Sequence, residues 1–69
     1  GLAEARRHSD ASREASLLGS MARVANLRGA HGEALGVAMD ALRLADRLDS
    51  PPGRAYALLE IGRAQVGLE

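Results

Sequence analysis

Apolar side chains recur at steps of three and four residues in three stretches of this chain, and that spacing is typical of one face of an α-helix. The pattern predicts three helices, over residues 11–28, 32–48 and 51–68. The central stripe of the middle helix is made of small residues, at Ala34, Ala38, Ala41 and Ala45. Small side chains allow two helices to approach closely. The apolar arc of the middle helix is also wide, so we expect this helix to pack against neighbours on more than one side.

Two groups of helix-breaking residues separate the predicted helices. Gly29 can adopt the left-handed conformation that ends a helix, and the connection that follows is so short that the first two helices must pack antiparallel. The segment Asp49–Pro52 ends the second helix and caps the third, because proline is tolerated in the first turn of a helix. Asp10 or Ser12 can cap the first helix. Residues 2–7 then read as the last turns of a preceding helix.

The composition narrows the possible classes of function. Nine basic residues, all of them arginine, balance nine acidic residues, so no electrostatic field attracts nucleic acid or anionic membranes. The chain has no cysteine, and its two histidines lack neighbours at metal-ligand spacing, so we expect neither a metal nor another cofactor. No apolar run approaches the ~20 residues of a membrane span, and the amino end has no signal-peptide core. We expect a soluble, cytoplasmic protein.

No catalytic arrangement is visible in the sequence. The serines have no histidine and carboxylate at a spacing that would activate a nucleophile. Gly29 and Gly32 flank a helical turn instead of following a strand, so they do not indicate a phosphate-binding loop. We therefore predict that the chain is not an enzyme. His31 is interpreted as a turn residue that leans across the helix pair, and a pH-sensitive contact is the alternative.

The chain also contains an internal repeat. When residues 1–29 are laid on residues 41–69, an offset of forty, several leucines, alanines and arginines coincide. Offsets of this size are typical of solenoids in which each unit is one pair of helices. We therefore predict one helical region over residues 1–69. In it, residues 1–8 end a preceding helix, residues 10–49 form one full repeat, and residues 50–69 form the first helix of the next.

The residues from Leu18 to Leu42 resemble the tetratricopeptide repeat family, in particular its longer-period members in bacterial regulators. In this resemblance, Ala22 is the small residue at which the two helices of a repeat touch, and Gly62 is its counterpart in the next repeat. The sequence departs from the family in its lack of aromatic residues, because Ala38 replaces one and Tyr56 is the only one present. The resemblance implies an all-α fold of antiparallel helix pairs, as a fragment of an α-α superhelix.

The resemblance also implies a function in protein binding. In the family, the first helices of successive repeats line a concave groove that holds peptide or protein segments. The residues expected to line it here are Arg23, Arg63, Asn26, Ser16, Tyr56 and Leu59. Arg23 and Arg63 occupy equivalent places one repeat apart, and a guanidinium can hold a carboxylate through two hydrogen bonds, so the partner is expected to be acidic. The alternative is that Glu60 simply pairs with Arg63.

Our leading hypothesis is a protein-interaction and assembly module from a larger bacterial regulatory or signalling protein, such as a transcription regulator. The alternative is a structural helical oligomerisation domain without a ligand groove. In either case, the apolar residues exposed at the end of the predicted array predict a homo-oligomer. They are Leu58, Ile61, Val66 and Leu68. Neither nucleic acid nor a membrane is expected as a partner.

Overall fold

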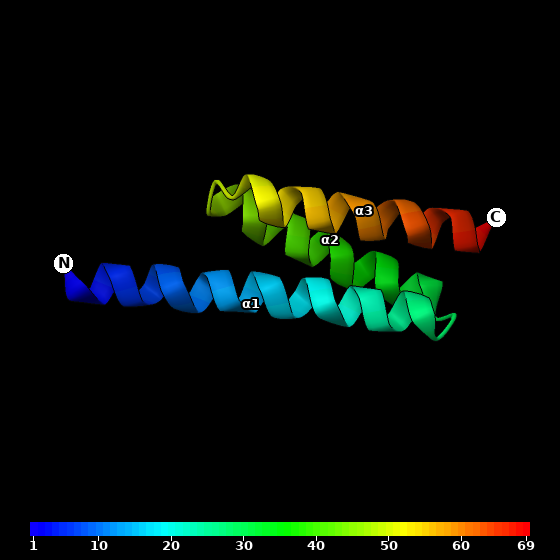
Figure 1. Cartoon of the computed structure of the whole chain (residues 1–69), viewed down its shortest axis with the longest axis horizontal. Helices are drawn as coiled ribbons and strands as arrows, with labels where there is room; N and C mark the ends of the chain where they lie inside the picture. Colours follow the sequence, from blue (N-terminus) through cyan, green and yellow to red (C-terminus); the bar gives the residue numbers. More distant parts are fainter.

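The computed structural model describes all 69 residues and contains three α-helices and no strands. They are α1 (Leu2–Leu27), α2 (His31–Arg47) and α3 (Pro51–Leu68). α1 and α3 run in the same direction, and α2 runs antiparallel to both (Figure 1). The molecule measures 46 × 18 × 14 Å, and it is long because the amino-terminal part of α1 extends beyond the other two helices (Figure 1). The predicted all-α fold is confirmed.

The turns after α1 and α2 have the same construction. Each contains one residue with positive φ, which is Gly29 (81°) in the first turn and Asp49 (50°) in the second. In both turns, the amide of this residue and the next amide donate to carbonyls of the last helical turn, over 2.8–3.2 Å. These two hydrogen bonds define a Schellman motif, which satisfies carbonyl groups that the helix itself leaves unpaired. The left-handed conformation predicted for Gly29 is therefore confirmed.

The start of α3 also follows the sequence prediction. The backbone of Ser50 is extended, and its hydroxyl accepts a hydrogen bond from the Gly53 amide over 3.3 Å. Pro51 and Pro52 occupy the first two helical positions, where a missing amide proton costs nothing because no carbonyl precedes it within the helix. The cap and the two prolines together fix the boundary between α2 and α3.

The start of α1 differs from the prediction. The helix runs without a break from Leu2 through Ser9 and Asp10, so residues 2–7 are not the end of a separate helix and the cap expected at Asp10 or Ser12 is absent. Serine and aspartate lower helix stability only slightly when they face solvent. No glycine or proline between Leu2 and Ser12 forces a turn. The division of the chain into repeat units remains a prediction.

Eight of the ten buried residues of the molecule are alanines. No leucine, isoleucine, valine or methionine is buried, and the eight alanines are Ala22, Ala25, Ala34, Ala38, Ala41, Ala45, Ala57 and Ala64. Ala25, Ala34 and Ala64 pack together, one from each helix. Because these side chains are short, helices can approach closely where the alanines meet.

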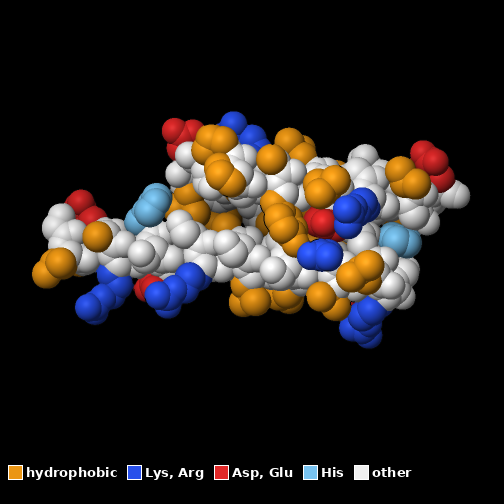
Figure 2. Space-filling view, in the orientation of Figure 1, with side chains coloured by type: hydrophobic (Ala, Val, Ile, Leu, Met, Phe, Trp, Pro, Cys, Tyr) orange, Lys and Arg blue, Asp and Glu red, His pale blue; other side chains and the backbone are white.

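The larger apolar side chains lie on the outside (Figure 2). On α1 the exposed stripe is Leu17, Met21 and Val24, and on α3 it includes Leu58, Leu59 and Val66. Side chains of this size on two edges of a small protein are unusual unless a further surface covers them. None of the three helices is long and apolar enough to cross a membrane.

Candidate functional site

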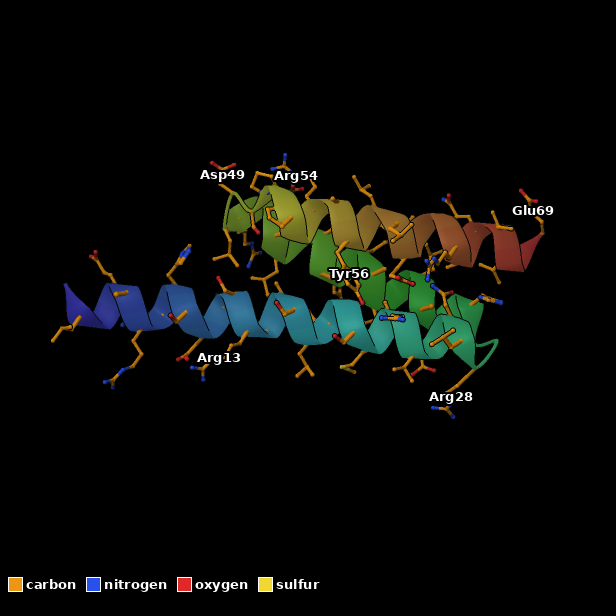
Figure 3. All side chains as sticks on the ribbon, in the orientation of Figure 1. Arg13, Arg28, Asp49, Arg54, Tyr56 and Glu69 are labelled. Carbon is orange, nitrogen blue, oxygen red and sulfur yellow. The ribbon has the colours of Figure 1, made fainter.

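α1 and α3 meet where a glycine faces an aromatic ring. A Cβ atom placed on Gly19 would lie 3.0 Å from the ring of Tyr56, which is closer than carbon atoms normally approach. Figure 3 shows Tyr56 pointing from α3 towards α1. Gly19 therefore provides the space that lets the Tyr56 ring lie against the α1 backbone and join the two helices.

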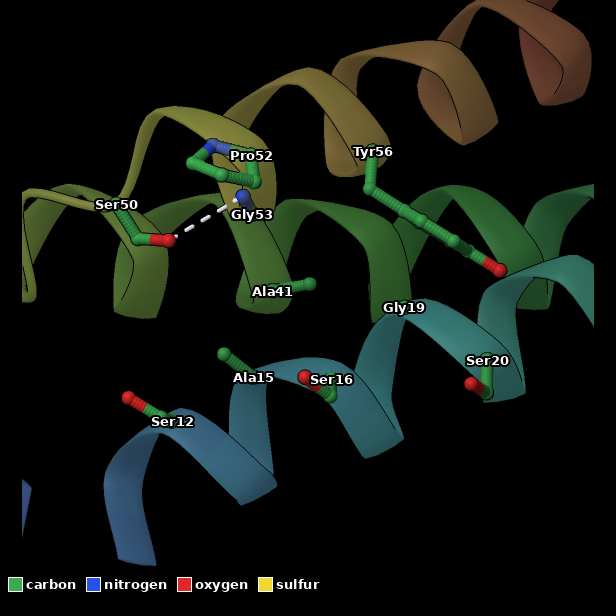
Figure 4. A pocket seen from close by; sticks show the side chains of 10 residues that line it. All are labelled: Ser12, Ala15, Ser16, Gly19, Ser20, Ala41, Ser50, Pro52, Gly53 and Tyr56. Atoms are coloured by element: carbon green, nitrogen blue, oxygen red, sulfur yellow. Dashed lines mark hydrogen bonds between the residues drawn. The ribbon is translucent and has the colours of Figure 1, made fainter. Parts of the chain in front are cut away.

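A hollow of about 300 Å³ opens beside this junction, and we refer to it as the α1–α3 hollow. Figure 4 shows side chains of α1, the start of α3 and one residue of α2 around it. The lining residues are Ser12, Ala15, Ser16, Gly19, Ser20, Ala41, Ser50, Pro52, Gly53 and Tyr56. Its volume is at the lower end of the range for ligand pockets, which is enough for one or two peptide side chains.

About two turns further along α1 from Gly19, a polar contact connects α1 to α3. The side-chain amide of Asn26 donates to the main-chain oxygen of Glu60 over 3.1 Å and to its carboxylate Oε1 over 3.0 Å. Glu60 is only 1% exposed and is the one charged residue buried in the protein. A buried carboxylate needs hydrogen-bond donors to compensate for its lost hydration, and Asn26 supplies one of them.

His31, the first residue of α2, connects this helix to the contact between Asn26 and Glu60. Its Nδ1 atom lies 2.9 Å from Oδ1 of Asn26. Because the Asn26 nitrogen already donates to Glu60, its oxygen is the acceptor and His31 Nδ1 is the donor. The other side of the imidazole lies against Gly67, where a Cβ would overlap the ring. His31 therefore leans across the helix pair, as predicted.

The two arginines expected to bind a partner stand on either side of the Asn26–Glu60 contact. Arg63 lies one turn after Glu60, and its Nη1 is 3.7 Å from Glu60 Oε2, so the predicted alternative of an internal pair is present. Arg23 lies one turn before Asn26, is exposed and forms no salt bridge. Figure 2 shows basic and acidic side chains gathered at the boundary between α1 and α3.

The six residues expected at the groove fall into separate groups. Ser16 and Tyr56 line the α1–α3 hollow, whereas Leu59 lies on the outward side of α3, in a shallow depression that Arg63 also borders. The polar atoms of the Asn26 side chain are engaged with Glu60 and His31. Asn26 therefore holds helices together and does not present a free amide to a partner.

The sequence predictions missed the central position of Glu60. A signal was available, because Glu60 lies between Ala57 and Ala64 at helical spacing, on the same face of α3 as these two buried alanines. A carboxylate on such a face requires a polar partner from another helix. The serines at positions 12 and 20, which line the hollow with Ser16, also share one face of α1 at four-residue steps.

The structure brings together no group of three or more histidine, aspartate and glutamate side chains that could hold a metal ion. Comparison of the chain with models of protein families, with characterised proteins and with solved structures found no match. The resemblance to tetratricopeptide repeats therefore rests on the sequence pattern alone, from Leu18 to Leu42 and from Leu58 to Ala64.

Proposed function

We propose that this chain is a non-catalytic protein-interaction module that binds an acidic peptide segment along the surface formed by α1 and α3. The observation that carries this proposal is the position of Arg23. It is an exposed arginine without a salt bridge, one turn beyond the Gly19 and Ser20 side of the α1–α3 hollow. A cation without a partner beside a concave surface favours an anionic ligand.

The two ends of the α1–α3 surface bind different parts of the partner in this proposal. At one end, Arg23 holds a carboxylate of the partner through its two parallel N–H groups. At the other, the hollow between Ser16 and Tyr56 receives a neighbouring side chain, with hydroxyl groups available as donors and acceptors. Arg63 contributes positive charge, and its contact with Glu60 keeps its guanidinium near the boundary between α1 and α3.

The resemblance to tetratricopeptide repeats supports the same proposal and extends it to recruitment of a partner within a regulatory or signalling protein. The alternative is a structural helical oligomerisation domain without a ligand groove. Its support is the pair of exposed apolar stripes on α1 and α3. If the chain binds an acidic peptide, the charges of Arg23 and Arg63 affect that binding. If the chain only forms oligomers, these charges have no peptide to bind.

The test is a titration, followed by NMR, of the whole chain with a short synthetic peptide of alternating glutamate and serine. A peptide with glutamine in place of glutamate serves as the ligand control. We expect the glutamate peptide to shift the backbone amide signals around Ser20, Arg23 and Arg63, and the glutamine peptide to leave them in place. If neither peptide shifts these signals, the proposed function is wrong.

Variants of the protein then test whether binding depends on this particular site or only on the overall charge of the protein. We expect the double change of Arg23 and Arg63 to alanine to weaken binding about tenfold or more, since a charge-assisted hydrogen bond contributes about 1.5–3 kcal/mol. The matched control changes Arg13 and Arg28 to alanine, because Figure 3 shows both pointing away from α3. Equal losses in the two double variants would contradict a specific site.

Arginine-to-lysine changes test the geometry of recognition. Replacement of Arg23 and Arg63 by lysine preserves the charge but removes the planar fork that binds a carboxylate in two places. We expect this double variant to bind as weakly as the double alanine variant. Thermal unfolding of all variants shows whether the loss of the Arg63–Glu60 contact changes the stability of the fold itself.

A further inference from the structure

α3 is apolar on two opposite faces. Its inner face packs against the other helices through Ala57, Glu60 and Ala64. Its outward face consists of Leu58, Leu59, Gly62 and Val66, and Leu58, Leu59 and Val66 are 51%, 53% and 69% exposed. A helix with apolar residues on two faces normally packs both faces against neighbours. The outward residues, which we name the α3 outer face, therefore indicate a contact with another molecule.

The residues of the α3 outer face follow the same pattern as a face of α1 that is packed against other helices of this chain. At the offset of forty, Leu58 and Gly62 correspond to Leu18 and Ala22 of α1, and Ala22 is completely buried where the helices meet. A Cβ on Gly62 would have no atom within 4 Å. Nothing within the chain thus requires glycine at this place, although glycine destabilises the interior of a helix relative to alanine. Gly36 in α2 is equally open, and what distinguishes Gly62 is that it lies within the exposed α3 outer face.

We propose that the α3 outer face binds the same face of a second copy of this chain, with the two α3 helices antiparallel and crossing at Gly62. Leu58 lies four residues before Gly62 and Val66 four residues after it. A two-fold axis at Gly62 therefore places Leu58 of each copy beside Val66 of the other, so the surface is complementary to itself. The small residue at the crossing lets the backbones approach, and the larger pairs pack on both sides.

The distribution of charge also favours a second copy. The chain carries no net charge at pH 7, so two copies do not repel each other as a whole. Between Arg54 and Glu69, the only charged residues of α3 are Glu60, which is buried on the inner face, and Arg63, which borders the outer face. A partner with a strongly charged helix would gain no ion pairs at the centre of this surface.

The size of the surface predicts a weak dimer. α3 has 18 residues and is therefore about 27 Å long. A contact along one such helix is smaller than the roughly 800 Å² per partner of a standard protein interface. We expect monomers and dimers in rapid exchange at micromolar to millimolar concentrations. The proposed peptide site is anchored by Arg23 on α1, which lies outside the α3 outer face, whereas Arg63 borders both surfaces.

Sedimentation equilibrium of the whole chain tests which face of the protein forms the dimer. We expect concentration-dependent dimerisation, and we expect its loss in the variants Leu58→Glu and Val66→Glu, which bury a charge only in the dimer. The controls Leu17→Glu and Met21→Glu place the same charge in the exposed stripe of α1 and should dimerise like the unchanged protein. A monomer at all concentrations, or association lost only in the α1 variants, would overturn the proposal.

Disulfide formation tests the symmetry. The natural chain has no cysteine, so Gly62→Cys introduces a single thiol, and two copies crossing at this residue bring their Cα atoms within the range that a disulfide needs. The matched control is Gly36→Cys, at an exposed glycine of α2 whose surroundings are equally open. We expect rapid oxidation to a covalent dimer at position 62 and not at position 36. Equal rates at both positions would contradict an antiparallel contact at Gly62.

Discussion

The side-chain amide of Asn26 in α1 donates to both the main-chain oxygen and the carboxylate of Glu60 in α3, over 3.1 and 3.0 Å. One residue therefore satisfies two acceptors on a helix 34 positions away in the sequence. Because most other buried residues are alanines, which pack equally well in several registers, this pair and the fit of the Tyr56 ring against Gly19 specify how α1 and α3 are aligned. Asn26 and Glu60 are therefore sensitive positions for stability.

We predict that Asn26→Ala lowers the free energy of unfolding by about 1–3 kcal/mol, because it leaves buried acceptors of Glu60 without a donor. Unfolding in urea, followed by circular dichroism, measures this change. Ser20→Ala is the control, since Ser20 is an exposed residue of the same helix without a hydrogen bond to another side chain. If both variants unfold at the same urea concentration, the contact does not contribute to stability.

A second prediction concerns Gly67 and His31. Gly67→Ala would drive a methyl group into the His31 ring, and the ring could then no longer reach Asn26. We expect a loss of about 1 kcal/mol, equal to one hydrogen bond. In a chain that already carries His31→Ala, the Gly67→Ala change should be neutral or stabilising, and a double-mutant cycle measures the difference. Additive effects of the two changes would show that the residues do not interact.

Much of the fold could be predicted because its causes are local. The limits predicted for the second and third helices, 32–48 and 51–68, differ from those of α2 and α3 by at most one residue. Alanine spacing, a glycine that ends a helix and a pair of prolines each act within a few residues. The amino-terminal limit of α1 was wrong because serine and aspartate favour a helix start only where some other residue interrupts the helix.

The candidate site was only partly predictable. The helical pattern of the sequence correctly placed Arg23 on the first of the three helices and Arg63 on the last. The engagement of Asn26 does not, because the pattern around this residue is equally compatible with an exposed amide. A single carboxylate such as Glu60 gives no indication whether it faces water or the interior until the helices that surround it are known. Contacts between segments that are distant in the sequence decide this, and the periodicity of a single helix gives no information about such contacts.

A third prediction tests the alanine core. Ala38 is completely buried on α2, so Ala38→Leu must push neighbouring helices apart or strain its own side chain. We expect destabilisation of about 1–3 kcal/mol, measured as a decrease in melting temperature. The adjacent exposed residue supplies the control, since Met39→Leu should change stability by less than about 0.5 kcal/mol. An unchanged melting temperature for Ala38→Leu would mean that the helices are not in close contact there.

The last prediction uses two glycines that differ only in backbone conformation. Gly29 has a positive φ, so Gly29→Ala forces a Cβ against a carbonyl oxygen and should destabilise the protein by about 1 kcal/mol. Gly36 lies inside α2 with open surroundings, so Gly36→Ala should stabilise it by about 0.5–1 kcal/mol, because alanine loses less conformational entropy in a helix.

The turn after α2 provides an internal check of this explanation, because Asp49 has the same left-handed conformation. Asp49 already carries a Cβ atom, so Asp49→Ala loses only the tolerance of aspartate for positive φ and should cost less than Gly29→Ala. Asparagine shares that tolerance, so Asp49→Asn should stay within about 0.5 kcal/mol of the unchanged protein. The contact of Asp49 with Arg54, at 3.9 Å on an exposed side chain, is too weak to alter this order. Chemical unfolding of the four variants under identical conditions gives the comparison. If Asp49→Asn were as destabilising as Asp49→Ala, the ion pair and not the backbone conformation would control this turn.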